Sequence, residues 1–79
     1  MTLNEALSVR IQELLKENNM TQYALFKKSG VSAQAINKII KQKNKMNALN
    51  IVYEIAQGFG MSLLQFFDSP LFAPENITD

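Results

Sequence analysis

The chain has 79 residues, of which 47% are hydrophobic and 19% charged, and its formal net charge is +1. This length allows one compact core but not two, and the apolar fraction is too high for a disordered chain. The absence of cysteine and histidine excludes disulfides, thiolate metal sites and the commonest general base. No signal-peptide pattern opens the chain, and no apolar stretch approaches the roughly 18 residues of a membrane span. We therefore expect one soluble, cytoplasmic domain without a cofactor or membrane contact.

The charged residues are distributed unevenly along the chain. Residues 21–46 contain six lysines and no acid, whereas residues 47–79 contain four acids and no base. A basic middle segment beside acidic flanks favours a surface that meets an anion. The alternative is a lysine-rich surface that touches only water, and charge alone does not decide between the two.

The first helix is predicted over residues 4–18. Thr2 and Glu5 have the spacing of a capping box, and leucine and isoleucine recur at helical intervals along one side. Two asparagines then end the helix, since asparagine tolerates the left-handed conformation of a helix stop. We expect Arg10 to pair with Glu13 or Glu17 of this helix, and the alternative is a phosphate contact from the helix.

The second and third helices are predicted over residues 21–29 and 32–41, and each begins at a residue that favours an N-cap. Gly30 suits a backbone position with positive φ. Because only Gly30 and Val31 lie between them, these helices cannot run antiparallel and must cross steeply. That arrangement is a helix-turn-helix.

The third helix has two chemically different faces. Aliphatic side chains form one face: Ile36, Ile39, Ile40 and Ala35. Amides and lysines form the opposite face: Gln34, Asn37, Lys38 and Lys41. An α-helix fits the major groove of B-DNA, where amides pair with adenine and lysine pairs with guanine. A polar face that touches only water is the alternative.

These residues divide into two kinds of expected DNA contact. We expect Gln34, Asn37 and Lys38 to contact bases, and the methyl group of Ala33 to meet a thymine. Phosphate contacts are expected from the end of the helix and the loop that follows: Lys41, Lys43, Asn44 and Lys45.

The fourth helix is predicted over residues 47–57 and is closed by a glycine-rich turn. Ser62 and Gln65 again have capping-box spacing and open a fifth, short helix that Pro70 stops. The remaining residues, 68–79, hold two prolines and three acids, and we expect them to wrap or fray.

The segment over residues 63–72 is unusually apolar for this end of the chain. Leu71 and Phe72 lie beyond Pro70 and are hard to bury locally. We therefore expect part of the segment to form a two-fold dimer contact, because symmetric DNA sites require two copies. Three methionines near turns are expected to fill gaps in the core: Met20, Met46 and Met61.

Two groups of residues carry a resemblance to a known family. The first is Thr21-Gln22, Leu25, Gly30-Val31-Ser32, Ile36 and Ile39, and the second is the run IAQGFGMSLLQFF from Ile55 to Phe67. Together they resemble the helix-turn-helix family of phage repressors and Cro-like proteins, also called the xenobiotic-response-element type, over about residues 7–67.

The resemblance implies an all-α fold, a compact five-helix lambda-repressor-like DNA-binding domain whose second and third helices form the helix-turn-helix. It also implies DNA binding as a dimer and a phosphate contact from Gln22. Base contacts in the family fall on positions that match Ser32, Ala33, Gln34, Asn37 and Lys38. Two departures stand out: Phe26 replaces a usual alanine between the crossing helices, and Ile40 replaces a frequent glutamate.

We therefore predict a DNA-binding domain over residues 1–67 and a short acidic tail over residues 68–79. The predicted function is sequence-specific binding of double-stranded operator DNA by a homodimeric transcription regulator, a repressor. The alternative is the antitoxin of a toxin–antitoxin pair or another protein-interaction module, with the tail as a docking segment. No serine or threonine has a base beside it, and three glycines leave little room for a phosphate-binding loop, so we expect no catalysis.

Overall fold

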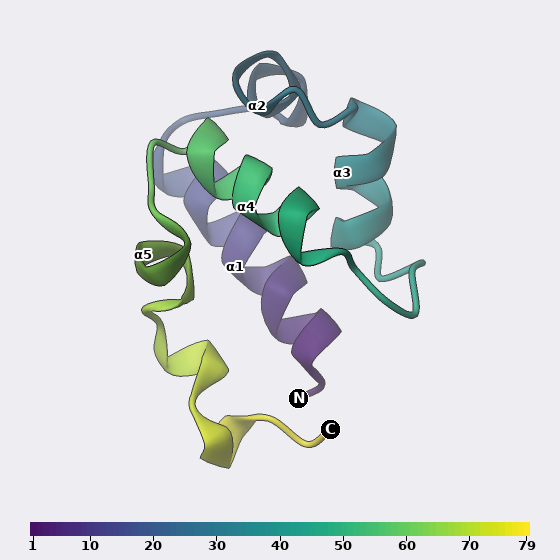
Figure 1. Ribbon diagram of the computed structural model, residues 1–79, viewed down its shortest axis with the longest axis vertical. Coiled ribbons are helices and arrows are strands. Elements are labelled where there is room, and N and C mark those ends of the chain that lie inside the picture. Colours follow the sequence, from purple (N-terminus) through teal and green to yellow (C-terminus); the bar gives the residue numbers. More distant parts are fainter.

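The computed structural model describes residues 1–79, and its regular elements are all helical. Figure 1 shows α1 and α4 stacked in the middle, α2 above them, α3 at the right and α5 at the left. The α-helices are α1 (Leu3–Glu17), α2 (Gln22–Ser29), α3 (Ala33–Ile40), α4 (Leu49–Gly58) and α5 (Leu63–Phe67), followed by the 3-10 turns η1 (Pro70–Phe72) and η2 (Pro74–Asn76). The predicted five-helix, strand-free fold is confirmed. None of the helices combines the length and the hydropathy that a membrane span requires.

Side-chain caps start four of the five α-helices, as the sequence predicts. Thr2 and Glu5 form a complete capping box at α1, in which each side chain accepts a hydrogen bond from the other residue's backbone N–H. Ser62 and Gln65 form the same box at α5. The hydroxyl groups at the starts of α2 and α3 each accept one bond from the backbone N–H three residues later. These bonds satisfy backbone groups that the helix itself leaves free.

The fourth helix begins later than predicted. It starts at Leu49, and no side chain caps it. Asn47, the predicted first residue, lies outside the helix, and its amide donates to the side chain of Asn4 at 3.0 Å. That long-range hydrogen bond has no local signal in the sequence.

Three helices end in the same left-handed turn. The second residue after each helix end has positive φ: Asn19 at 49°, Gln42 at 57° and Gly60 at 72°. In each case the next N–H bonds to a carbonyl five residues back, as Lys43 does to Lys38 at 2.9 Å. This arrangement satisfies the last carbonyls of the helix. The α2 helix stops instead at Gly30, which has φ 78°.

The core lies between α1 and the other four α-helices. Its eleven buried side chains are Leu7, Ile11, Leu14, Leu25, Val31, Ile36, Ile39, Val52, Ile55, Ala56 and Phe66. The α2 and α4 helices approach closely at Gly58, where an added Cβ would lie 2.8 Å from the Cβ of Ser29 and 2.9 Å from the Cδ1 of Leu25. Only glycine fits there without a shift of α2.

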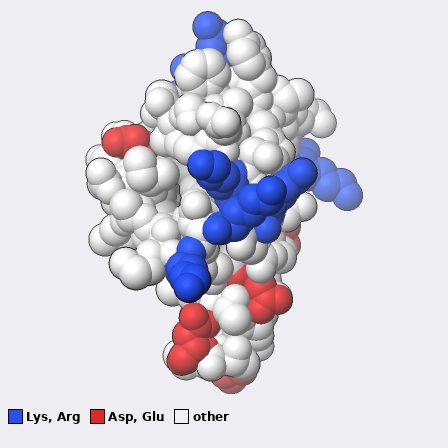
Figure 2. Space-filling model, turned by 90° about the vertical axis from the view of Figure 1, so that its right-hand side faces the viewer, with Lys and Arg blue, Asp and Glu red and all other residues white.

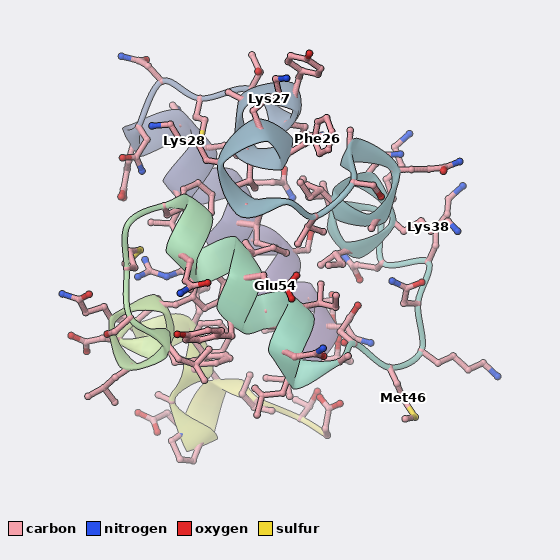
Figure 3. All side chains as sticks on the ribbon, turned by 45° about the horizontal axis from the view of Figure 1, so that its top comes forward. Phe26, Lys27, Lys28, Lys38, Met46 and Glu54 are labelled. Carbon is pink, nitrogen blue, oxygen red and sulfur yellow. The ribbon has the colours of Figure 1, made fainter.

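The methionine prediction is confirmed for two residues and wrong for one. Met20 and Met61 pack against the core. Met46 does not, because it lies in the loop between α3 and α4 and is 87% exposed. Figure 3 shows it at the outer edge of that loop.

Three phenylalanines close the lower end of the core. Phe66 is fully buried, and the ring centroids of Phe67 and Phe72 lie 5.2 and 6.4 Å from its own. Phe67 and Phe72 are 4.8 Å apart in an edge-to-face arrangement. Phe72, for which the sequence suggested no local partner, therefore packs within its own chain. Leu64 remains 83% exposed on the same segment.

Arg10 also belongs to this lower end. Its Nε donates to the carbonyl of Phe66 at 2.7 Å, and its Nη2 donates to the carbonyl of Gln65 at 3.0 Å. The predicted pairing with a glutamate of its own helix is wrong, because the guanidinium turns toward α5. A cation stabilises the free carbonyls at the end of a helix.

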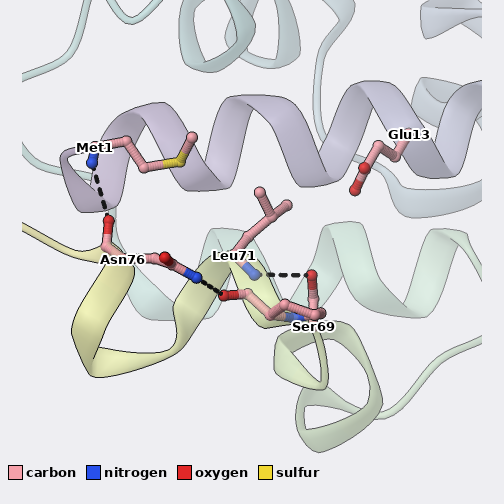
Figure 4. Close-up of a pocket in the computed structure, with 6 residues that line it drawn as sticks. Met1, Glu13, Ser69, Leu71 and Asn76 are labelled. Carbon is pink, nitrogen blue, oxygen red and sulfur yellow. Dashed lines mark hydrogen bonds between the residues drawn. The ribbon is translucent and has the colours of Figure 1, made fainter.

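The C-terminal residues wrap back onto the N-terminus. The amino group of Met1 donates to the carbonyl of Asn76 at 2.9 Å, and Thr78 N–H donates to the carbonyl of Met1 at 2.9 Å. The N–H of Leu3 donates to the carboxylate of Asp79 at 2.6 Å. Figure 4 shows the first of these bonds beside a hollow of about 450 Å³ between α1 and the tail.

Candidate nucleic-acid interface

The turn between α2 and α3 is short and well held. Val31 is 4% exposed, and its N–H donates to the hydroxyl of Ser29 at 3.1 Å. The hydroxyl of Ser32 accepts from the N–H of Ala35 at 3.1 Å and so starts α3 directly after the turn. Figure 1 shows α2 nearly end-on where α3 runs vertically, so the two helices cross steeply. The predicted helix-turn-helix geometry is present.

The aliphatic face of α3 packs inward as predicted. Ile36 and Ile39 are 0% and 3% exposed, and Ala35 and Ile40 are half-buried against the core. The carbonyl of Ile40 also accepts a hydrogen bond from the hydroxyl of Ser8 on α1. Ser8 is 1% exposed and ties the end of α3 to α1, a role that the sequence did not suggest.

The opposite face of α3 carries the residues predicted to contact bases. Gln34 and Lys38 are exposed, while Ala33 and Asn37 are half-buried. Ser32 is exposed, although its oxygen is engaged in the cap of α3. Figure 3 shows Lys38 on the outer side of the molecule. One surface thus presents amide, hydroxyl, methyl and ammonium groups together.

Positive charge gathers on the same side of the molecule. Lys38, Lys41, Lys43 and Lys45 are all exposed on α3 and the loop that follows it. Figure 2 views this side, where basic side chains cluster near the middle and most of the acidic ones lie below. The lysines that are clustered in the sequence are therefore also clustered on the surface, and this favours the approach of an anion.

Three asparagines fix the shape of the loop between α3 and α4. The amide nitrogen of Asn4 donates to the carbonyls of Asn44 and Lys45 at 3.2 and 3.1 Å. The oxygen of Asn4 accepts from Asn47 at 3.0 Å, and the oxygen of Asn47 accepts from Asn44 at 3.2 Å. The side chain of Asn44 is thus turned inward and half-buried, unlike those of the lysines beside it. Sequence reasoning missed Asn4, because some forty residues separate it from its partners.

The second helix brings further polar groups. Gln22 is its first residue and is half-buried. Lys27 and Lys28 are exposed in its last turn, at the upper side of the molecule in Figure 3. The Nζ of Lys27 lies 5.8 Å from the centre of the Tyr23 ring, a cation–π distance.

The two departures from the resembled family are accommodated by packing. Phe26 lies on the side of α2 toward α3 in Figure 3, packs against the core and meets the ring of Tyr23 edge-on at 5.8 Å. Ile40 is half-buried against the same core. Neither residue covers the exposed Gln34 or Lys38.

No group of three or more acidic side chains is positioned to hold a metal ion. The hollow between α1 and the tail has Glu13 as its one acidic lining residue, and an amide from Asn76 and a hydroxyl from Ser69 also line it. The surface of α3 and its loop, by contrast, combines exposed amide and ammonium groups from Gln34, Lys38, Lys41, Lys43 and Lys45.

Comparison with known proteins agrees with this geometry. A family model described as Helix-turn-helix, of the Cro/C1 type, matches residues 11–66. No curated protein and no solved structure was found to match the chain. The matched residues span the crossing of α2 and α3 and extend into α5. The chain therefore belongs to the Cro/C1-type helix-turn-helix family of DNA-binding transcription regulators.

Proposed function

We propose that the protein binds a specific operator sequence by placing α3 in the major groove, and that it acts there as a repressor. One observation carries the proposal: the outer face of α3 is polar and continues into an exposed row of lysines on the following loop. The helix fits the groove, and the lysines meet the flanking phosphates. Occupancy of DNA is enough for repression, whereas activation needs a further contact.

Base reading is assigned to the residues on the outer face of α3. Gln34 and Lys38 are the most exposed of them and suit adenine and guanine respectively. Asn37 lies at the edge of the packed face, so its amide reaches a base only when the helix is deep in the groove. Ala33 and Ser32, at the start of α3, offer a methyl and a hydroxyl.

Phosphate contact is assigned to the ends of α2 and α3. Lys41, Lys43 and Lys45 are exposed on one side of the molecule, and Gln22 stands at the first turn of α2. Asn44 has already used one amide proton on Asn47, which leaves one for a phosphate oxygen. These contacts set position and salt dependence rather than sequence choice.

We propose a two-fold dimer on DNA, with half-sites about 34 Å apart. Sedimentation with and without an operator duplex tests this, and a monomer under both conditions would contradict it. The alternative of a toxin-binding module has less support, because residues 76–79 of the tail bond to the N-terminal residues. A tail that binds a protein partner would first have to leave those bonds.

Titration of selected and random duplexes at two salt concentrations tests the DNA proposal. We expect Lys38→Ala to weaken binding to the selected duplex by about five- to 150-fold and to the random duplex much less. Lys45→Ala should weaken both alike and lower the salt slope by about one. Lys16→Ala, which removes the same charge from the last turn of α1, is the matched control. Equal affinity for selected and random duplexes would overturn base reading by α3.

A further inference from the structure

The basic loop between α3 and α4 is unusual in how it is held. After the turn that ends α3, the backbone of residues 44–47 makes no hydrogen bond to any other backbone group. An unsupported loop of this kind would sample many shapes in solution. It nevertheless carries Lys45 and directly follows Lys43, two of the lysines assigned to phosphate.

One side chain from the far end of the sequence supplies the missing support. The amide nitrogen of Asn4 bonds two successive carbonyls of the loop, those of Asn44 and Lys45. Its oxygen accepts from Asn47, whose own oxygen accepts from Asn44. Both ends of the Asn4 amide are thus occupied by the loop, and the three asparagines form one connected network.

Asn4 is itself firmly placed. It is the second residue of α1, directly before Glu5 of the capping box that starts this helix. The preceding N–H, of Leu3, is bonded to the carboxylate of Asp79. The loop is therefore attached to a helix end that is held by the capping box and by the bond to Asp79.

We infer that Asn4 is a positioning residue for DNA binding, because it orders the loop that grips phosphate before the duplex arrives. The inference rests on the proposed function and adds to it a residue that touches no DNA. A loop ordered in advance loses less conformational freedom on binding. Since phosphate contacts carry no sequence information, Asn4 should affect all duplexes alike.

The test compares Asn4→Ala with Asn18→Ala in the full chain. Asn18 is the matched control, since its side-chain amide also bonds a backbone carbonyl, that of Leu14 at 2.7 Å, but at the other end of α1. We expect Asn4→Ala to bind selected and random duplexes about three- to tenfold more weakly and Asn18→Ala to bind both normally. Backbone ¹⁵N NMR relaxation of residues 44–47 should show increased flexibility only in Asn4→Ala.

A double variant separates positioning from general stability. If Asn4 acts by holding Lys45, then Asn4→Ala should weaken binding much less in a Lys45→Ala background than in the native chain. Independent losses that simply add, or a loss no larger than that of Asn18→Ala, would overturn the inference. Should Asn4→Ala fail to fold, Asn47→Ala breaks the same network from within the loop and must show the same coupling.

Failure of the inference is distinguishable from failure of the proposed function. If Lys45→Ala weakens binding while Asn4→Ala does not, the phosphate contact stands and the positioning role falls. If neither Lys45→Ala nor Lys38→Ala changes binding, the assignment of this surface to DNA falls, and the positioning role falls with it.

Discussion

The α3 and α5 helices begin in the same way and are used in opposite ways. Ser32 and Ser62 each accept a hydrogen bond from the N–H three residues later. Beyond that start, α3 leaves Gln34 and Lys38 on its outer face exposed. In α5, by contrast, Gln65 bonds back to Ser62, and the last carbonyls receive the guanidinium of Arg10. Gln65 and Phe66 of α5 thus serve the fold, whereas Gln34 and Lys38 on the outer face of α3 remain available for a ligand.

The difference lies in where the polar groups find partners. A local cap starts a helix but says nothing about whether its outer face will be covered. On the α5 side, Arg10 bonds the carbonyls of Gln65 and Phe66, and the ring of Phe66 packs against two other rings. On the α3 side, the groups that remain free are those able to bind DNA. The comparison predicts that substitutions of the buried residues of α5 change stability, and that substitutions on the outer face of α3 change binding.

The largest expected effect is that of Phe66→Ala. Phe66 is fully buried and contacts two other rings, so its removal leaves a cavity and should lower the free energy of unfolding by about 3–5 kcal/mol. Urea unfolding monitored by circular dichroism measures it. Leu64→Ala, in the same helix but at a position 83% exposed, should change stability by less than about 0.5 kcal/mol. Similar losses from the two variants would refute the packing described for α5.

The next largest effect is expected where α2 and α4 pack closely, at Gly58. Gly58→Ala places a Cβ 2.8 Å from that of Ser29, so α2 must shift, and we expect a loss of about 1–3 kcal/mol. Thermal unfolding measures it. In a Ser29→Gly background, which removes the nearer of the two clashing side-chain atoms, Gly58→Ala should cost less stability than in the native chain. An undiminished loss in that background would rule out crowding against Ser29 as the cause.

A smaller effect, of opposite sign, is expected at the end of α3. Gln42 has φ 57°, a conformation that glycine adopts without strain. Gln42→Gly should therefore raise the free energy of unfolding by about 0.5–1 kcal/mol, since relief of backbone strain outweighs the added freedom of the unfolded chain, and leave duplex affinity unchanged. Chemical unfolding and duplex titration together check both parts. A destabilised Gln42→Gly protein would mean that the glutamine side chain contributes more than its backbone strain costs.

The smallest effect concerns the two capping boxes, one with an acid and one with an amide. Hydrogen bonds from Thr2, chiefly its backbone N–H and then its hydroxyl, lower the pKa of Glu5 below the ordinary 4.5. Ionised Glu5 therefore stabilises the folded protein fully above pH 4.5, and this contribution is lost as the pH falls through the lowered pKa. Glu5→Gln, which copies the amide of Gln65, should lack this pH dependence. An NMR titration that finds an ordinary pKa for Glu5 would contradict it.

Features set by neighbours in sequence could be predicted. The capping boxes at Thr2 and Ser62, the left-handed stop at Gly30 and the two faces of α3 all depend on residues a few positions apart. Helical periodicity and cap chemistry are local, and they survive folding unchanged. The division of α3 into inner Ile36 and outer Lys38 followed from the same reasoning.

Features set by distant partners could not be predicted. Arg10 has glutamates nearby on its own helix, yet its donors reach the carbonyls of α5. Asn4 and Asn47 look like ordinary helix-start residues until the fold brings them together. Met46 is apolar but lies on a loop with no surface to cover it. The individual DNA contacts assigned to α3 and its loop remain predictions that binding measurements must decide.

The bond between Thr78 and Met1 has a practical consequence for protein engineering. Because these residues at the two ends of the chain lie within 2.9 Å, backbone nitrogen to carbonyl oxygen, a short flexible linker could join the termini into a ring. New ends could then be opened at another exposed turn without breaking the core. Figure 1 places both native ends at the pole opposite α2, so a reporter fused to either native end would lie far from that helix.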